Sequence, residues 1–319
     1  MQKITKNTYD KELRPMYGPM KMLSTMLMKP WGLFLLRKIF SLPKGSKIKG
    51  LHNEQRYIPS KNGGPDIRIR IFRPKTEEKL PALLYIHGGG YIVGNPEVSL
   101  GFIKNYINKR PCVVVAPDYR KAHKEPYPAA LNDCYDTLLW IQENADELGI
   151  KADKFVVAGH SAGGGLTAAV TLKACDTGEV DIAFQMPIYP MIDHRQNTES
   201  AMAMDQGVPA WNARNNALGW KMYLRDVEGD VPPYASPSLA TNYKHMPPTI
   251  TFVGDLEPFK DETINYVEAL RKEGIPVKFE LFEGAFHAFE TVAKNAGVSK
   301  KANKFQYDAW AEYYDQYLT

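Results

Sequence analysis

Short apolar runs rich in β-branched residues recur along the chain and alternate with longer amphipathic segments. The runs are Ala82–Ile86, Val113–Ala116, Phe155–Ala158, Ile182–Pro187, Thr249–Val253 and Val277–Leu281. Helical periodicity appears between several of them, in Ala129–Leu148, Ala162–Ala174 and Lys260–Lys272. Buried strands that alternate with helices are typical of a parallel sheet covered on both faces. The pattern therefore predicts an α/β fold with a mainly parallel central sheet flanked by helices.

Ahead of this pattern, Gln55–Pro59 and Asp66–Arg73 predict an antiparallel pair of strands, because turn-forming Asn, Gly and Pro residues separate them. In the second strand, isoleucine alternates with arginine; the residues are Ile67, Arg68, Ile69, Arg70 and Ile71. A period of two is typical of a strand with one face in the core and one face in water. We therefore expect this strand to be half exposed, at the edge of the sheet.

Two segments depart from the alternation of strands and helices. Residues 1–45 combine a helical Met and Leu periodicity with Pro and Gly breaks, and residues 193–236 contain a predicted helix at Arg214–Arg225. Open α/β sheets bind their ligands beyond the carboxyl ends of the strands. We expect both segments to form a cap there. The catalytic domain is then residues 46–319, with 193–236 inserted as the second part of the cap.

The charge balance and the cysteines exclude several classes of protein. Forty Lys and Arg residues nearly cancel 36 Asp and Glu residues, which leaves a net charge of +4. A nucleic-acid partner is not expected, since it would require a clustered basic face. The three cysteines, Cys112, Cys134 and Cys175, have no zinc-binding spacing. We expect free thiols in a reducing, cytoplasmic setting.

The apolar stretch from Met16 to Leu42 is interrupted by Lys, Arg and Pro residues. It is therefore too polar to span a membrane or to act as a signal peptide. One use of such a basic, Met-rich segment is as a membrane-surface helix of an interfacial lipase. We favour the alternative, in which the apolar side of the segment packs over a substrate pocket.

The clearest chemical signal is the pentapeptide Gly159-His-Ser-Ala-Gly163, which has the form G-x-S-x-G. A predicted strand precedes it and a predicted helix follows it, which is the setting of a nucleophile elbow. Small neighbours allow the chain to turn sharply, so that the Ser161 hydroxyl projects above the sheet. The positive end of the following helix also lies near the developing negative charge. We predict Ser161 as a catalytic nucleophile.

The sequence His87-Gly-Gly-Gly90 directly follows the strand predicted at Ala82–Ile86. Acyl transfer passes through a tetrahedral oxyanion, which preorganised N–H groups stabilise. Consecutive glycines let the backbone approach a substrate, and no GKS or GKT sequence follows that would indicate a phosphate loop. We predict an oxyanion hole formed by the N–H groups of Gly89, Gly90 and Ala162.

A serine hydroxyl needs a base that takes its proton. Of the seven histidines, His287 lies on the loop after the last predicted strand, at the same edge of the sheet as Ser161. We predict His287 as this base. His87 and His160 lie inside the two glycine motifs, where we expect them to support the loops. The remaining four are expected at the surface: His52, His123, His194 and His245.

A carboxylate must orient the imidazole and stabilise its charged form. In enzymes with a nucleophile elbow, the acid follows the serine and precedes the histidine along the sequence. The loop after Thr249–Val253 offers three candidates, Asp255, Glu257 and Asp261. Their positions in the sequence leave the choice among the three open.

These motifs resemble the hormone-sensitive-lipase-like family of bacterial carboxylesterases. The segment His87–Gly94 resembles the family's HGGG block, and Asp118–Ala130 resembles its DYRLAPE–PFPAA stretch. The segment Gly159–Gly164 matches its elbow. The resemblance covers roughly residues 50–300, with the motifs in the family's order. It implies the α/β-hydrolase fold.

The resemblance also implies which carboxylate serves as the acid. Family members usually carry Asp-Pro-Leu-x-Asp-Glu at this place, where the present chain has Glu257-Pro-Phe-Lys-Asp-Glu. The register implies Glu257 as the third member of the triad, with Asp255 as the alternative. Two further departures are His160, where Asp is frequent, and His123-Lys124 within the DYRLAPE-like stretch. They bear on substrate preference rather than on the class of reaction.

We therefore expect a serine carboxylesterase that hydrolyses small esters with short to medium acyl chains through an acyl-enzyme, without a metal or an organic cofactor. An amidase of the arylacylamidase or formamidase type could use the same residues. A non-catalytic ligand receptor on this scaffold is a further alternative, but such receptors in plants lack the catalytic histidine, which is present here.

The resemblance suggests a homodimer, since dimers are common in the family. Several large side chains of the predicted cap have two alternative roles, in the core of the cap or in the lining of the acyl pocket. They are Met202, Met204, Trp211 and Trp220. We favour the core for these four residues.

Overall fold

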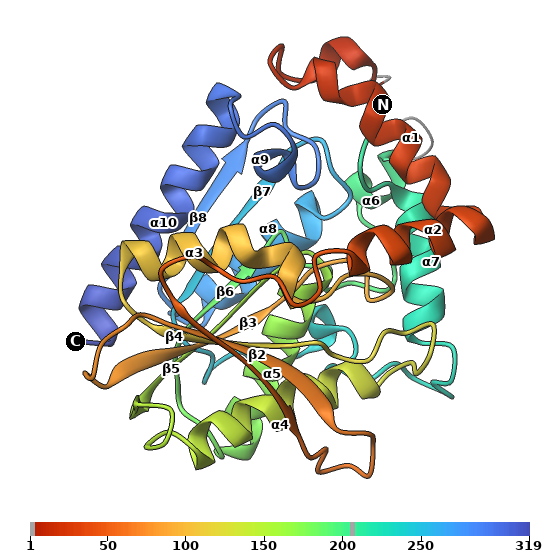
Figure 1. Cartoon of the computed structure of the whole chain (residues 1–319). Coiled ribbons are helices and arrows are strands. Elements are labelled where there is room, and N and C mark those ends of the chain that lie inside the picture. The colour runs from red at the N-terminus through yellow and green to blue at the C-terminus, as the bar shows by residue number, and fades with distance from the viewer. Residues whose placement is uncertain (1–3, 205–207) are drawn as a thin grey trace.

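The computed structural model describes residues 4–204 and 208–319, which build an eight-stranded sheet between layers of helices (Figure 1). The strand order is β1-β2-β4-β3-β5-β6-β7-β8, with β1, β2 and β4 paired antiparallel and the remaining neighbours parallel. The strands are β1 (His52–Ile58), β2 (Ile67–Arg73), β3 (Leu80–Ile86), β4 (Val113–Pro117), β5 (Ile150–His160), β6 (Ile182–Ile188), β7 (Thr249–Gly254) and β8 (Val277–Phe282). The predicted mainly parallel sheet is confirmed.

The helices are α1 (Tyr17–Leu27), α2 (Pro30–Ser41), α3 (Leu100–Lys109), α4 (Ala129–Glu143), α5 (Ala162–Thr177), α6 (Glu199–Ala203), α7 (Ala213–Tyr223), α8 (Lys260–Lys272), α9 (Phe289–Val292) and α10 (Gly297–Tyr317). Helices α4, α5, α7 and α8 lie on the four segments for which the sequence predicts helix bounds, whereas α3 and α10 are not predicted. The helix predicted to reach Leu148 ends at Glu143, where the C-cap residue Asn144 leaves helical geometry. No helix within the described ranges combines the length and the apolarity that a bilayer crossing requires.

The two faces of the sheet are covered by different helices. Helices α4, α5 and α8 pack on one face, while α3 and α10 pack on the other. Alternate residues of β3 divide between the two cores, since Leu84 and Ile86 belong to one and Leu83 and Tyr85 to the other. Both faces of β3 and of its parallel neighbour β4 are therefore buried, which explains why their sequences are apolar throughout rather than alternating.

The prediction of a half-exposed edge strand is wrong for β2. This strand lies between β1 and β4, and Arg68 and Arg70, which alternate with its isoleucines, are buried. The buried carboxylate of Glu97, on the short 3₁₀ turn Pro96–Ser99, accepts hydrogen bonds from Arg68 and, at 2.6 Å, from Arg70. The alternation of isoleucine and arginine therefore marks an internal ion cluster, because a buried partner on a distant segment neutralises the guanidinium groups.

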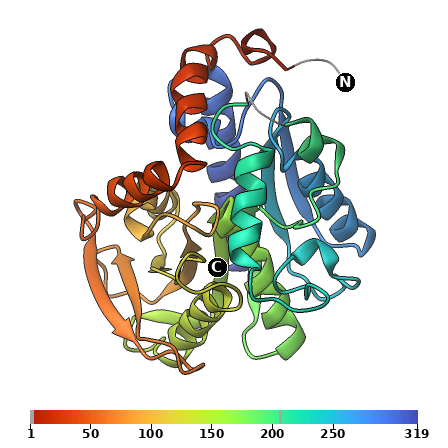
Figure 2. The ribbon, with the colours of Figure 1, turned by 90° about the vertical axis from the view of Figure 1, so that its right-hand side faces the viewer.

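The two segments that depart from the strand–helix alternation lie side by side. Helix α1, followed directly by α2, lies next to α7 at one end of the molecule (Figures 1 and 2). The amide of Asn215 donates to the carbonyl of Ser24 at 2.9 Å, and the N–H of Ala210 donates to the carbonyl of Met20 at 3.3 Å. Residues 1–3 of the first segment and 205–207 of the second lie outside the described residues.

The buried Glu97 cluster yields a prediction about stability. Burial alone would raise the pKa of Glu97, but the hydrogen bond and charge of Arg68 and the N–H of Gly45 hold that pKa below its usual range. Replacing Glu97 with Gln leaves the buried Arg70 without a counter-charge and leaves Arg68 with Asp118 as its remaining acidic partner, at 3.1 Å. We expect Glu97→Gln to lower the free energy of unfolding by about 3 kcal/mol in urea titrations.

The matched control for this prediction is Glu143→Gln, which removes the carboxylate that pairs with Lys61 at the surface. An exposed ion pair contributes little, because water and salt screen it. Equal losses of stability in the two variants would contradict the assigned role of the buried cluster.

Candidate active site

Ser161 lies at a sharp turn between β5 and α5. Its backbone has φ 59° and ψ −123°, a conformation that side-chain-bearing residues rarely adopt. A Cβ atom at Gly159 would lie 2.4 Å from the carbonyl oxygen of Gly163, and one at Gly163 would lie 2.1 Å from that of Ile86. The two glycines of the pentapeptide are thus required by close backbone contacts, and the strained turn directs the Ser161 hydroxyl away from the sheet.

Three predicted residues come together in a hydrogen-bonded series. The Nε2 atom of His287 lies 2.9 Å from Oγ of Ser161, and its Nδ1 atom lies 2.5 Å from Oε2 of Glu257. The N–H of Gly254 donates to the other oxygen of Glu257 at 3.1 Å. All three side chains are buried or nearly so. One imidazole therefore connects the hydroxyl to a carboxylate that is itself held in place.

The other two candidate acids have different partners. Asp255 accepts a hydrogen bond from the N–H of Ala285 at 3.3 Å, and burial raises the pKa of this carboxyl. Asp261 accepts from the N–H of Ser200 at 2.6 Å. Each therefore fixes a loop, while the longer side chain of Glu257 reaches His287.

The glycine loop after β3 lies against the elbow. A Cβ atom at Gly88 would lie 2.8 Å from the carbonyl oxygen of His160, so the loop passes directly beside the turn. Gly89 and Gly90 have φ values of 128° and 58°, which glycine adopts without strain. Within the described chain, no carbonyl or side chain accepts the N–H groups of Gly89, Gly90 or Ala162. These three donors remain available beside the Ser161 hydroxyl.

The two histidines of the glycine motifs are buried and support the site from behind. Burial lowers the pKa of His87 and of His160 to about 3, so both imidazoles are neutral near pH 7. His87 stacks on Tyr119 at a centroid distance of 4.3 Å, and His160 stacks on Phe102 at 3.9 Å. His160 is also hydrogen-bonded to the hydroxyl of Tyr85 at 2.8 Å. At this position, where Asp is frequent in the family, His160 thus places a neutral aromatic ring in the core.

The sequence analysis missed the residues that surround the ring of His287. Tyr189 and Phe259 pack edge-on against it, at centroid distances of 4.9 and 5.0 Å. The Tyr189 hydroxyl donates at 2.5 Å to Glu290, a fully buried carboxyl three residues beyond His287. No pattern in the sequence indicates these contacts, since they join loops after β6, β7 and β8. The proximity of Glu290 to His287 in the sequence is the single available signal.

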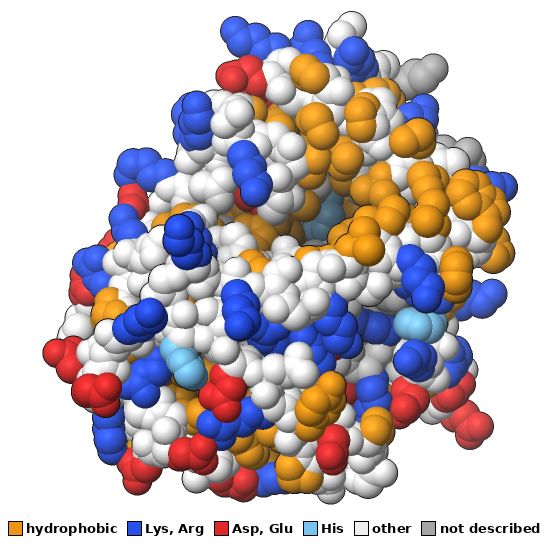
Figure 3. Space-filling view, in the orientation of Figure 1, with side chains coloured by type: hydrophobic (Ala, Val, Ile, Leu, Met, Phe, Trp, Pro, Cys, Tyr) orange, Lys and Arg blue, Asp and Glu red, His pale blue; other side chains and the backbone are white. Residues whose placement is uncertain are grey.

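Ser161 and His287 open into a cavity of about 420 Å³ with a mostly apolar lining. Figure 3 shows this hollow with a histidine at its floor and apolar side chains around its mouth. The N-terminal segment supplies much of the lining, with Met20, Leu23, Leu27, Leu36 and Phe40.

Among the four large cap residues considered above, Trp211 lines the cavity and presses against Gly90. Met204 and Trp220 are buried outside the cavity lining, as expected for core residues. Met202 is exposed and belongs to neither group, so the expectation is wrong for this residue.

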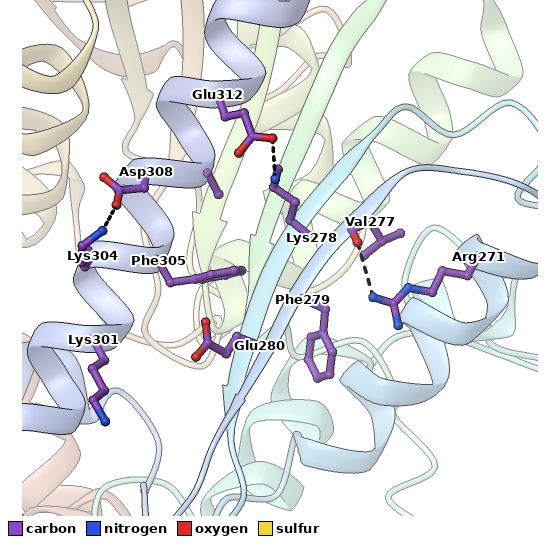
Figure 4. Close-up of a pocket in the computed structure, with 11 residues that line it drawn as sticks. Arg271, Val277, Lys278, Phe279, Glu280, Lys301, Lys304, Phe305, Asp308 and Glu312 are labelled. Carbon is purple, nitrogen blue, oxygen red and sulfur yellow. Dashed lines mark hydrogen bonds and ion pairs between the residues drawn. The ribbon is translucent and has the colours of Figure 1, made fainter.

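A second hollow, of about 590 Å³, lies between β8 and α10 (Figure 4). Four of its charged side chains pair with one another, Lys278 with Glu312 and Lys304 with Asp308. Its lining contains no histidine, serine or cysteine. This hollow therefore lacks the hydroxyl–imidazole pair that lines the cavity at Ser161.

An elbow serine, a histidine–carboxylate pair and a glycine loop at the carboxyl ends of a mainly parallel sheet define an α/β hydrolase. Comparison with protein families agrees, since the model of the alpha/beta hydrolase fold matches residues 83–291. The chain belongs to this family, in the branch that includes the hormone-sensitive-lipase-like enzymes, as the motifs predicted.

Individual relatives and solved structures are similar over most of the chain. Esterase LipI of Mycobacterium tuberculosis is 30% identical over 75% of this chain and 76% of its own length. An arylesterase of Saccharolobus solfataricus is 30% identical over 70% of this chain and 73% of its own. The structure of a bacterial heroin esterase superposes with a TM-score of 0.89 at 33% identity, over 97% of this chain and 99% of the other.

The buried carboxyl of Glu290 yields a prediction about stability and pH. Burial raises the pKa of Glu290 from its ordinary 4.5 to about 7. Between these two pH values, the folded protein keeps the proton of this carboxyl, whereas the unfolded chain has lost it. The protonated carboxyl therefore contributes to the free energy of unfolding. Its contribution is fully present below pH 4.5 and is lost as the pH rises through 7, a change of about 3 kcal/mol. Glu290→Gln cannot lose the proton, so its stability relative to wild type should increase from pH 5 to pH 8.

Urea unfolding of wild type and variant at the two pH values measures this difference. Glu280→Gln, which changes an exposed carboxylate of β8, is the control and should show no such pH-dependent gain. A constant difference between Glu290→Gln and wild type at both pH values would contradict the assigned protonation.

Proposed function

We propose that this protein is a serine carboxylesterase in which Ser161 is the nucleophile, His287 the general base and Glu257 the acid that orients it. The observation that carries the proposal is the hydrogen-bonded series from Ser161 Oγ through His287 to Glu257, beside three free N–H groups. Carboxylesterase activity follows from family membership, together with relatives named esterase and arylesterase.

The geometry supports a two-step acyl transfer. His287 removes the proton from Ser161 as the hydroxyl oxygen attacks the carbonyl carbon of the ester. The N–H groups of Gly89, Gly90 and Ala162 stabilise the resulting oxyanion. The protonated imidazole then gives its proton to the departing alcohol, which leaves an acyl-enzyme. Water, deprotonated by the same imidazole, attacks the acyl-enzyme and releases the acid and the free serine.

Short to medium acyl chains form part of the proposal. A cavity of about 420 Å³ with apolar walls favours an acyl group that it can enclose and disfavours a polar one. A non-catalytic receptor role is not favoured, because the hydroxyl and the imidazole lie at reactive distance. The three cysteines are unpaired in agreement with a reducing, cytoplasmic setting, which we include in the proposal.

We further propose that residues 1–45 and 193–236 act together as a cap over a catalytic domain of residues 46–319. The hydrogen bonds from Asn215 to Ser24 and from Ala210 to Met20 support this division, because they join the two segments directly. Met20 and Trp211, one from each segment, also line the cavity. Substrate selection would then depend on residues from both parts of the cap.

Loss of the nucleophile tests the reaction class. We expect Ser161→Ala to reduce hydrolysis of p-nitrophenyl butyrate by at least roughly a thousandfold, because the remaining groups cannot form an acyl-enzyme. Ser41→Ala, which changes an exposed serine outside the cavity, should retain full activity. A folded wild-type protein that hydrolyses aryl amides but no ester would contradict the carboxylesterase proposal and favour an amidase.

The acyl preference is tested with a series of p-nitrophenyl esters. We expect kcat/KM to be highest for acetate, butyrate and hexanoate and to fall steeply towards palmitate, because the enclosed volume is limited. Rates that continue to rise with chain length in detergent-free solution would contradict a cavity that encloses the acyl group.

A pair of variants tests the assignment of the acid. Glu257→Gln keeps the shape of the side chain but removes the charge that stabilises the imidazolium, so we expect kcat to fall by roughly 10³–10⁴-fold with little change in KM. Asp255→Asn is the matched control and should change kcat by no more than a few-fold. The reverse order of effects would assign the role to Asp255.

A further inference from the structure

The outward face of α2 is apolar. The helix buries Leu33 and Leu36 against the protein, as an amphipathic helix does. Its opposite face carries Trp31 and Phe34, with 62% and 61% of their surface exposed, and continues to Leu42, which is 80% exposed. A surface helix of a soluble protein ordinarily presents polar side chains on that face. Here both faces are apolar, and the protein itself covers one of them.

The apolar surface continues onto α1 and borders the mouth of the cavity (Figure 3). We define the α1–α2 patch as Met22, Met28, Trp31, Phe34, Leu35, Ile39 and Leu42. Of the 11 exposed large hydrophobic residues in the described chain, these seven belong to the patch. Such exposure is therefore concentrated rather than scattered, which is typical of an interaction surface.

The segment that carries the patch is strongly basic. Residues 13–53 contain eight Lys or Arg and no Asp or Glu, whereas the whole chain has a net charge of only +4. Lys21, Lys29 and Lys38 are exposed around the patch and form no ion pair with a described residue. The charged side chains of this segment, which border the patch, are thus all positive.

We propose that the α1–α2 patch docks on an anionic lipid surface. Apolar side chains enter the boundary between headgroups and acyl chains, while lysines on the same helices extend to the anionic headgroups. The absence of acidic residues in this segment argues against a second copy as the occupant. A symmetric dimer through the patch would bring two identical basic rims together, and like charges across an interface repel.

Docking in this way has a consequence for substrate access. Helices α1 and α2 line the cavity with Leu27, Leu36 and Phe40 on their inner side, and they present the patch on their outer side. The mouth of the cavity would therefore open at the lipid surface. Delivery of lipid-borne esters to Ser161 rests on the proposed esterase function. Docking itself does not, since vesicle binding is measured without catalysis.

Vesicle sedimentation with the full-length protein tests the proposal. The vesicles are phosphatidylcholine alone, or phosphatidylcholine with one third phosphatidylglycerol. We expect binding to the anionic vesicles, weakened by added salt, and at least tenfold weaker binding for Trp31→Ser/Phe34→Ser. Trp31→Phe should bind like wild type, because it keeps an apolar ring. Tyr57→Ser, which removes an equally exposed ring from β1, should also bind like wild type.

Hydrolysis of p-nitrophenyl acetate in solution shows that each variant is folded, since Trp31 and Phe34 lie outside the cavity lining. Ser161→Ala should bind vesicles like wild type, which separates docking from the esterase proposal. Absence of binding to anionic vesicles, or equal binding by the Trp31→Ser/Phe34→Ser variant, would overturn the inference. So would a wild-type dimer that binds no vesicle and becomes monomeric in that variant, because the patch would then be an interface between copies.

Discussion

The strained turn at Ser161 is the constraint from which the rest of the site is built. A residue with φ 59° at the junction of β5 and α5 costs of order 1–3 kcal/mol and persists only where its surroundings hold it. The glycines at 159 and 163 make this possible, because they let the turn lie against the carbonyl end of β3. The glycine loop begins where β3 ends. The packing that holds Ser161 therefore also brings the three N–H donors beside it.

Three buried carboxyl groups lie on the segments that follow β7 and β8, and each has different contacts. Glu257 faces an imidazole and an N–H, and Glu290 faces a tyrosine hydroxyl in a dry pocket. Glu262, also buried, accepts the N–H of Ile192 and fixes the loop after β6. The chemical type is the same in all three cases. Their different hydrogen-bond partners distinguish Glu257, which contacts His287, from Glu262 and Glu290, which do not.

The N-terminal segment connects this site to the outside of the molecule. Its inner side chains complete the cavity, and the carboxylate of Glu97 accepts the N–H of Gly45, which ties the end of the segment to β2. Its outer side chains form the α1–α2 patch. Apolar residues on both the inner and the outer face of α2 are difficult to interpret from the sequence, because a helix needs only one apolar face to pack on the core.

Local patterns determined much of this protein. The apolar runs gave the strands, the G-x-S-x-G and HGGG motifs gave the positions of Ser161 and the glycine loop, and the order of residues indicated His287. These features depend on neighbours in the sequence, where periodicity and backbone geometry act directly. The choice of Glu257 required a resemblance, since three carboxylates on one loop are equivalent until side-chain reach is known.

Only the tertiary structure decided the features that depend on distant segments. Arg68 and Arg70 of β2 are buried because Glu97, some thirty residues later, meets them inside the protein. Glu290 and Tyr189 act on the environment of His287 because the ends of three parallel strands meet at one edge of the sheet. Whether an apolar side chain lines a cavity, fills a core or faces outward depends on what packs against it, and the sequence alone does not contain that information.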